Sequence, residues 1–240
     1  MNTLIGIVLL KCLLAPFQCD FDIKNRGIGG NSTSDLIARV ETDVISENPD
    51  IVILMIGTND MVNSHKMISY ERFSSNLDRL ICLIKTNSID IVLVSPPPVD
   101  TIYLFERHDK EKFLDPPNKK LATISNILKN KSAENDLSYI DINNYFKRLG
   151  VPDHDTDTLI NNVVNSGLRD GVHLTEHGNK IVAQQIFASL INTGKIKKGG
   201  KIICFGDSLT YGAHVDGEGT TTRDTYPAYL RELICNYIQK

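Results

Sequence analysis

Short apolar runs separated by amphipathic stretches constrain the fold of this chain more than any other feature. Several of these runs are continuous in Val, Ile and Leu rather than alternating with polar residues. The five predicted strands are Phe21–Lys24, Ile51–Ile56, Ile89–Val94, Ser138–Ile142 and Lys201–Phe205. Continuous apolar strands are typical of a parallel sheet that is buried on both faces.

Stretches with helical periodicity lie between the predicted strands. The predicted helices are Asp35–Ser46, Tyr70–Thr86, Asn118–Asn130, Glu176–Ile191 and Tyr226–Ile238. Strands that alternate with helices imply right-handed crossovers. We therefore predict an α/β domain of three layers, in which helices cover both faces of a five-stranded parallel sheet. Two longer stretches, Pro96–Pro117 and Val151–Arg169, are predicted to be irregular, and loops of that length are often functional or disordered.

Length and composition indicate a single globular domain. A chain of 240 residues suffices for one sizeable α/β core. A net charge of -3 gives no reason to expect nucleic acid or an anionic membrane as partner. No H-E-x-x-H motif or Cys/His cluster is present, so no metal or other cofactor is expected.

The cysteines are scattered, odd in number and without CxxC spacing: Cys12, Cys19, Cys82, Cys204 and Cys235. Neither a zinc site nor a disulfide framework is predicted from them. Cys82 and Cys204 lie in apolar runs and are expected to be small buried residues.

The N-terminal segment, residues 1–19, has two interpretations. Met1–Phe17 is mostly apolar, but Lys11 interrupts it and it is short for a membrane span, so stable membrane insertion is not expected. It is either a signal-like segment, which implies an extracytoplasmic protein, or a helix packed on the domain, which implies a cytoplasmic one. Residues 20–240 are predicted to form the single domain.

Ser208 directly follows the last predicted strand, in the run Gly206-Asp207-Ser208-Leu209-Thr210. A serine hydroxyl is a weak nucleophile until a base accepts its proton. Among the six histidines, His173 has Asp170 three residues before it, so one loop could present an imidazole and the carboxylate that orients it. The alternative is an Asp-Gly turn with a surface histidine before the next helix.

Two further segments could donate hydrogen bonds to a developing oxyanion. Gly30 lies in the glycine-rich stretch after the first strand, and Asn59 lies in Gly57-Thr58-Asn59-Asp60 after the second. Such residues are also expected in ordinary turns. Because ligands of parallel sheets bind outside the carboxyl ends of the strands, we expect Ser208, Gly30 and Asn59 to lie at one edge.

Together these blocks resemble the SGNH, or GDSL, hydrolase superfamily of esterases, lipases and carbohydrate deacetylases. Asp170–Asn179 is similar to the isoamyl-acetate-hydrolysing esterase branch, and Ser95-Pro96-Pro97-Pro98 to small arylesterase-like members. The resemblance implies a flavodoxin-like fold. It also implies Ser208 as nucleophile, His173 as base and Asp170 as its orienting partner. The oxyanion hole would then comprise Ser208, Gly30 and Asn59.

The order of the blocks departs from the family pattern, which begins with the nucleophile. Here Ser208 comes last, so the resemblance implies a circular permutation. Thr193–Gly200 would connect the former ends, and Tyr226–Ile238 would be the family's first helix. Domain termini often lie close together, which makes such a rearrangement tolerable.

The resulting prediction is a serine esterase that hydrolyses small-molecule carboxylic esters, with short acyl chains, through an acyl-enzyme. Alternatives of the same fold are a carbohydrate O-acetyl esterase and a lysophospholipase or thioesterase. An alternative of another class is a catalytically inactive SGNH-like binding domain. A nucleotide-binding protein is disfavoured because Ser32 replaces the last glycine of the G-x-G-x-x-G pattern after the first strand.

Overall fold

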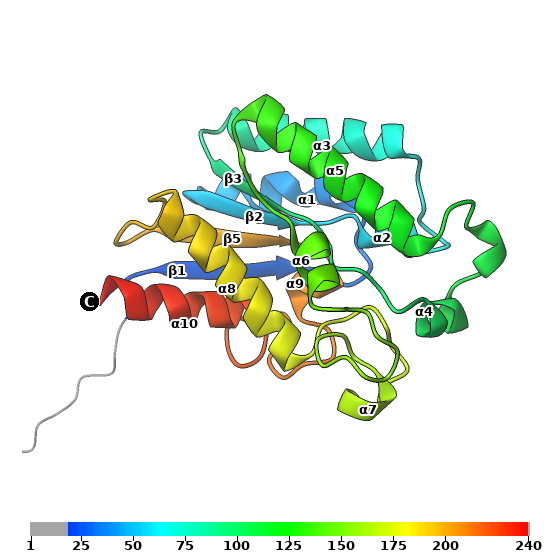
Figure 1. Ribbon diagram of the computed structural model, residues 1–240. Coiled ribbons are helices and arrows are strands. Elements are labelled where there is room, and N and C mark those ends of the chain that lie inside the picture. Colours follow the sequence, from blue (N-terminus) through cyan, green and yellow to red (C-terminus); the bar gives the residue numbers. More distant parts are fainter. Residues whose placement is uncertain (1–18, 240) are drawn as a thin grey trace, which may run out of the picture.

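The computed structural model describes residues 19–239 and has a parallel sheet at its centre (Figure 1). The five strands lie in the order β1-β5-β2-β3-β4. Their bounds are β1 Asp22–Gly27, β2 Ile51–Met55, β3 Asp90–Val94, β4 Ser138–Ile140 and β5 Lys201–Gly206. The predicted α/β fold with a five-stranded parallel sheet is confirmed.

Helices cover both faces of the sheet, as predicted (Figure 1). The long helices are α1 Thr33–Asp43, α3 Tyr70–Lys85, α5 Pro117–Asn135, α8 Glu176–Asn192 and α10 Tyr226–Ile238. Each corresponds to a helix expected from apolar periodicity. The shorter ones are α2 Thr58–Val62, α4 Thr101–Arg107, α6 Ile142–Arg148, α7 Val163–Ser166 and α9 Ser208–Tyr211, with 3-10 turns at Ile45–Glu47 and Lys110–Lys112.

The two stretches predicted to be irregular contain some of these short helices. Pro96–Pro117 holds α4 and a 3-10 turn, and Val151–Arg169 holds α7. The prediction of irregular structure was therefore wrong for these parts. A helix of seven residues such as α4 is too short to show an apolar stripe, and the Asp100 side chain that accepts the Ile102 N–H defines its start.

Alternate residues of the central strands face the two helical layers, because successive side chains of a strand point to opposite faces. Ile53 and Cys204 pack on the side of α8 and α10. Leu54 and Phe205 pack on the opposite side, with Leu77 of α3. Burial on both faces accounts for the continuous apolar runs in the sequence.

The last strand of the chain, β5, lies inside the sheet between β1 and β2. Gly206 of β5 is in register with Gly27 of β1 and with Met55 of β2. If β5 is counted as the first strand, the order β1-β5-β2-β3-β4 becomes 2-1-3-4-5, the order of flavodoxin-like sheets. The strand that precedes Ser208 is thus the second strand in the order of the sheet, although it is the last of the five in the sequence.

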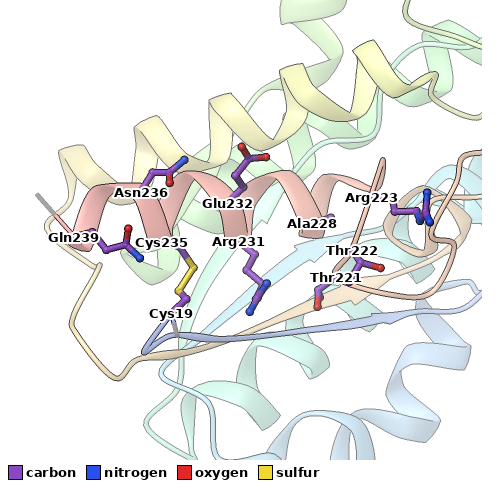
Figure 2. Close-up of a pocket in the computed structure, with 10 residues that line it drawn as sticks. All are labelled: Cys19, Thr221, Thr222, Arg223, Ala228, Arg231, Glu232, Cys235, Asn236 and Gln239. Carbon is purple, nitrogen blue, oxygen red and sulfur yellow. A yellow bond between two sulfur atoms is a disulfide. The ribbon is translucent and has the colours of Figure 1, made fainter. Parts of the chain in front are cut away.

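Cys19 and Cys235 form a disulfide that joins the start of β1 to α10, beside a pocket lined by Arg231 and Glu232 (Figure 2). The prediction that no disulfide follows was wrong for this pair. The two residues are 216 positions apart, so no spacing pattern in the sequence could indicate their contact. Cys204 is buried as expected, whereas Cys82 is exposed, contrary to the prediction, because it lies on the outer side of α3.

The predictions for the N-terminal segment fall on residues 1–18, which lie outside the described residues. Within residues 19–239, no helix is both long enough and apolar enough to cross a bilayer.

Candidate active site

Three loops meet at the carboxyl edge of the sheet because the strands before them end in register. Gly27, Gly206 and Met55 are aligned, and the Ile28 N–H donates to the Gly206 carbonyl at 3.2 Å. The segments that carry Gly30, Ser208 and Asn59 therefore begin side by side. This is the common edge that the sequence predicted.

Ser208 is the first residue of the short helix α9, immediately after β5. The Asp207 side chain caps this helix by accepting the Leu209 N–H at 2.9 Å. Gly206 is required just before the turn, since a Cβ there would lie 2.3 Å from the Met55 carbonyl oxygen and 2.3 Å from Thr210 Oγ1. Close packing of the strand end thus presents the serine at the sheet edge.

Ser208, His173 and Asp170 are in direct contact. His173 Nε2 lies 3.0 Å from Ser208 Oγ, and His173 Nδ1 lies 2.7 Å from Asp170 Oδ2. The other carboxylate oxygen, Oδ1, accepts the N–H groups of Val172 and His173, each at 2.7 Å. A carboxylate on Nδ1 favours the tautomer with its proton there, which leaves Nε2 free to accept the serine proton.

The electrostatics of Asp170 suit a permanently ionised group. Its side chain is buried, which by itself raises the pKa. Hydrogen bonding and charge attraction from His173 outweigh that effect and hold the Asp170 pKa well below its usual range, assisted by the backbone N–H groups of His173 and Val172.

The Asn59 side chain is held in place by two neighbours. Its Nδ2 donates to the Asn31 carbonyl at 3.0 Å, and its Oδ1 accepts from Asn63 Nδ2 at 3.0 Å. A carboxamide carries two N–H bonds, so one donor remains for another acceptor. Next to it, Asp60 accepts both the N–H and the hydroxyl of Thr33, at 3.1 and 2.5 Å, which ties this turn to the start of α1.

Gly30 and Ser208 offer backbone donors at the same edge. Gly30 has φ +75°, a left-handed conformation that favours glycine, and apart from its chain neighbours no atom of the described residues lies within 4 Å of where its Cβ would be. A ligand can therefore approach this part of the backbone closely. The Ser208 N–H belongs to the first turn of α9, where no acceptor exists within the helix.

Two residues that the sequence analysis did not single out contact Asp170. Arg107 Nη1 lies 3.2 Å from Asp170 Oδ2, and its Nη2 donates to the Asp170 carbonyl at 2.5 Å. His214 Nε2 lies 3.4 Å from the same Oδ2 atom. Arg107 is 63 positions from Asp170, in a stretch predicted to be irregular. Neither residue carried a local signal.

One group among the described residues has the composition of a metal site. Asp170, His173 and His214 offer ligand atoms that lie within 4.8 Å of one another. Both nitrogens of His173 already face hydrogen-bond partners, and the Arg107 guanidinium lies against Asp170 Oδ2. A cation at that oxygen would meet a fixed positive charge, so the donor set fits an acid–base pair better than a resident metal.

Two buried carboxyl groups lie beneath the site. Burial raises the pKa of Asp207 to about 7, although the Leu209 N–H lowers it in part, and Asp207 Oδ2 has no hydrogen-bond partner. Burial likewise raises the pKa of Asp60 to about 6, against the lowering effect of its bonds from Thr33. Both groups favour the neutral form more than a solvated aspartate does.

Comparison with known proteins supports this assignment of the fold and identifies the family. The model of the GDSL-like Lipase/Acylhydrolase family matches residues 11–181. This range includes Gly30, Asn59, Asp170 and His173 and ends before Ser208.

Two curated proteins are similar in sequence. An uncharacterized lipoprotein, YqeF of Bacillus subtilis (strain 168), is 28% identical over 181 residues, which cover 70% of this chain and 72% of that protein. An acetylxylan esterase of Geobacillus stearothermophilus is 27% identical over 126 residues, or 50% of this chain and 53% of the esterase. The match thus spans about half the length of that esterase.

Solved structures show the same fold. A lipase/acylhydrolase from Enterococcus faecalis superposes with a TM-score of 0.54 at 23% identity, covering 70% of this chain and 74% of that one. The acetyl xylan esterase AlAXEase superposes with a TM-score of 0.54 at 26% identity, covering 68% of this chain and 78% of that one. With the family match and the arrangement at the sheet edge, these likenesses lead to one conclusion: the chain belongs to the GDSL-like lipase/acylhydrolase family and is an ester-hydrolysing enzyme.

Proposed function

We propose that this protein hydrolyses carboxylic esters with short acyl groups, using Ser208 as nucleophile, His173 as general base and Asp170 as the group that orients the imidazole. The observation that carries the proposal is the 3.0 Å separation of His173 Nε2 and Ser208 Oγ. That distance is within the range for proton transfer from a nucleophile to its base.

In the first half of the reaction, His173 Nε2 accepts the Ser208 proton while Oγ forms a bond to the acyl carbon. The carbonyl oxygen becomes negatively charged in the tetrahedral intermediate. The donors proposed for it are the N–H groups of Ser208 and Gly30 and the remaining N–H of the Asn59 side chain. Donors that are already in place stabilise this charge without reorganisation in the transition state.

In the second half, the imidazolium gives its proton to the departing alcohol oxygen and the ester bond breaks. This leaves an acyl group on Ser208. Water then gives a proton to His173 Nε2 as it attacks the acyl carbon. The bond from that carbon to Ser208 Oγ breaks, the imidazolium returns the proton to Oγ, and the carboxylic acid leaves. Asp170 remains ionised throughout and stabilises the imidazolium at each stage.

Acetylated carbohydrate is the second candidate substrate. Two of the similar proteins are named as acetylxylan esterases, one from Geobacillus stearothermophilus and one as AlAXEase. The side chains around the proposed oxyanion donors are also polar. Lys66 Nζ donates to the Gly30 carbonyl at 2.8 Å, and Asn63 contacts Asn59. Polar groups beside the proposed oxyanion donors suit a hydroxyl-rich alcohol better than a long lipid chain.

We further propose that residues 20–240 form one circularly permuted domain, with 193–200 as the connector between the former ends. The strand order becomes flavodoxin-like when β5 is counted first. The match to the family covers residues 11–181 and leaves the nucleophile segment beyond its end. The proposed connector is a short turn between α8 and β5, with Gly194 and Gly199 at positive φ.

A substrate panel with a covalent probe tests the proposal. A fluorophosphonate should label the wild-type protein on Ser208 and leave Ser208→Ala unlabelled. Rates with p-nitrophenyl esters from acetate to palmitate should fall as the acyl chain lengthens. Acetate release from acetylated xylan, assayed beside a lysophospholipid and a thioester, decides among the substrate alternatives. A protein that is folded but neither labelled nor active on any of these esters would be the inactive binding domain instead.

A further inference from the structure

The Asp170 carboxylate has a charged partner besides the histidine that it orients. Its side chain is only 3% exposed, yet Arg107, which is 38% exposed, lies 3.2 Å from Oδ2. This is the oxygen that also contacts His173 Nδ1 at 2.7 Å. Arg107 and His173 therefore share Oδ2, which His214 Nε2 also approaches at 3.4 Å, while Oδ1 accepts backbone N–H groups.

Arg107 also binds the backbone of the loop that carries the pair. Its Nη2 donates to the Asp170 carbonyl at 2.5 Å, so the planar guanidinium spans a main-chain and a side-chain oxygen of one residue. A lysine could supply the charge but not this two-point geometry.

The loop rests on the helix from which Arg107 projects. The residues Asp100, Tyr103 and Arg107 recur at the spacing that places side chains on one face of a helix. The Asp100 N–H donates to the Gly171 carbonyl at 2.7 Å. A Cβ at Gly171 would lie 2.7 Å from the Asp100 carbonyl oxygen, so loop and helix are in close contact. Asp100 at the start of α4 and Arg107 at its end thus donate hydrogen bonds to the carbonyls of two consecutive loop residues, Gly171 and Asp170.

We infer that Arg107 is a positioning residue that fixes the Asp170 carboxylate and competes with His173 for its Oδ2 atom. The inference rests on the proposed function. The Arg107 guanidinium and the His173 imidazolium would both interact with Asp170 Oδ2. Part of the negative charge is then neutralised by the guanidinium, so Asp170 stabilises the imidazolium less. Removing the guanidinium would make the imidazolium more favourable, and a higher pH would be needed to free the base.

The charged and titratable side chains around Asp170 and His173 come from the loop itself, from α4, from the strand end before Ser208 and from the segment after α9. Asp170 faces His173 on its own loop, Arg107 from α4 and His214 from the segment after α9. Buried Asp207 interacts electrostatically with His173. Glu106 and His108 flank Arg107 in sequence, and the Glu106 carboxylate is bound by Arg169. Arg107 is the cation with two contacts to Asp170.

Arg169 provides a matched control. It pairs with Glu106 on the same helix α4, its side chain is 61% exposed, and its Nε lies 2.9 Å from Glu106 Oε2. It is adjacent in sequence to Asp170, but its guanidinium forms an ion pair with Glu106. Its loss removes the same charge and a similar volume near the same loop.

The test is a pH profile of kcat/KM with p-nitrophenyl acetate for wild type, Arg107→Met, Arg107→Lys and Arg169→Met. Arg107→Met should lower kcat roughly tenfold, a fraction of the ~10²–10⁴ that a positioned general base contributes. Its acidic limb should move to higher pH by roughly one unit, the lower end for a removed neighbouring charge because Arg107 is partly solvated. Arg107→Lys should keep the wild-type midpoint and lose part of kcat, and Arg169→Met should change neither.

The inference is overturned if Arg107→Met keeps both the wild-type kcat and the wild-type midpoint, or if kcat falls without any shift of the midpoint. If Arg107→Met fails to fold, as judged by circular dichroism, Arg107→Lys decides, and wild-type kcat in that variant refutes the positioning role. Failure of the proposed function is separately visible, because the wild-type protein would then show no turnover of any ester, or Ser208→Ala would retain wild-type turnover.

Discussion

Cys235, near the end of α10, is disulfide-bonded to Cys19, just before β1, with their Cα atoms 5.5 Å apart. In the proposed family order the chain would pass from α10 directly into β1. The disulfide therefore lies where the proposed permutation removes a peptide connection, and it joins α10 to the segment just before β1. The Tyr226 N–H, which donates to Asn179 Oδ1 at 3.0 Å, holds the other end of α10 against α8.

Loss of this disulfide should destabilise the fold and leave the site chemistry intact. Cross-linking residues 216 positions apart restricts the unfolded chain strongly, so Cys235→Ser should cost about 2–5 kcal/mol. For a domain of this size that corresponds to a fall of roughly 5–15 °C in Tm. Thermal unfolding with and without reductant measures it. Cys82→Ser, at an exposed free cysteine, is the control. Equal Tm values for the wild type, Cys235→Ser and Cys82→Ser would contradict the prediction.

Ser208→Ala should abolish esterase activity without changing stability. Removal of a triad nucleophile in serine hydrolases costs at least ~10³-fold in kcat. The matched control is Ser64→Ala, since Ser64 is also a buried serine beside an imidazole, with Oγ 3.4 Å from His108 Nδ1. Initial rates and melting curves of both variants check this. A Ser208→Ala enzyme with wild-type rates would exclude the proposed nucleophile.

Asn59→Ala should reduce kcat by ~10²–10³-fold and leave KM nearly unchanged, because a donor to the oxyanion acts mainly in the transition state. Asn59→Asp should be at least as damaging, since it replaces the donor with negative charge at the same place. Steady-state kinetics with p-nitrophenyl acetate distinguish this from a binding role. A rise in KM at constant kcat would assign Asn59 to substrate binding instead.

The free energy of unfolding should fall as pH rises from about 4 to about 7, because Asp207 is buried in the folded protein. Burial raises its folded-state pKa to about 7, so in this window the folded state holds a proton that the unfolded state has released. Stability then falls with increasing pH, by at most a few kcal/mol, roughly 1.4 per unit of pKa difference. Asp207→Asn, which is neutral at all pH values, should flatten this dependence. Urea unfolding at pH 4 to 8 measures it, and parallel curves for the two proteins would show that Asp207 is ionised in the folded state.

A chain rebuilt in the proposed family order should fold and hydrolyse the same esters. It would start at Lys201, run through α10, continue by a short linker into residues 20–192 and omit the connector 193–200. The packing among the helices and strands is retained, and the new linker replaces the Cys19–Cys235 bond, so kcat/KM should be within a few-fold of the original. An insoluble or inactive product, beside an active original, would argue against the permutation.

Local patterns in the sequence were enough to predict the sheet and its long helices. Ile51–Met55 and Lys201–Gly206 are continuous apolar runs because both faces of the sheet are covered. The candidate site residues were also visible, since Ser208, Gly30 and Asn59 each follow a predicted strand. That placement depends only on where strands end and on the common direction of parallel strands.

Other features depended on chain segments that meet only in the folded protein. Helix α4 has too few residues to show periodicity. Hydrogen bonds to the Asp170–His173 loop stabilise it in the folded protein. The Cys19–Cys235 bond and the Arg107–Asp170 contact join positions far apart in the chain. No window of sequence contains both members of either pair.

By itself, the sequence determined which segments become strands and helices and which turns carry reactive side chains, because periodicity and turn chemistry are properties of neighbouring residues. Tertiary structure alone decided that β5 is inserted between β1 and β2, that Arg107 contacts the Asp170 carboxylate and that Cys19 is bonded to Cys235. These contacts form only when helices cover both faces of the sheet and bring distant segments together, a constraint that acts on the whole chain at once.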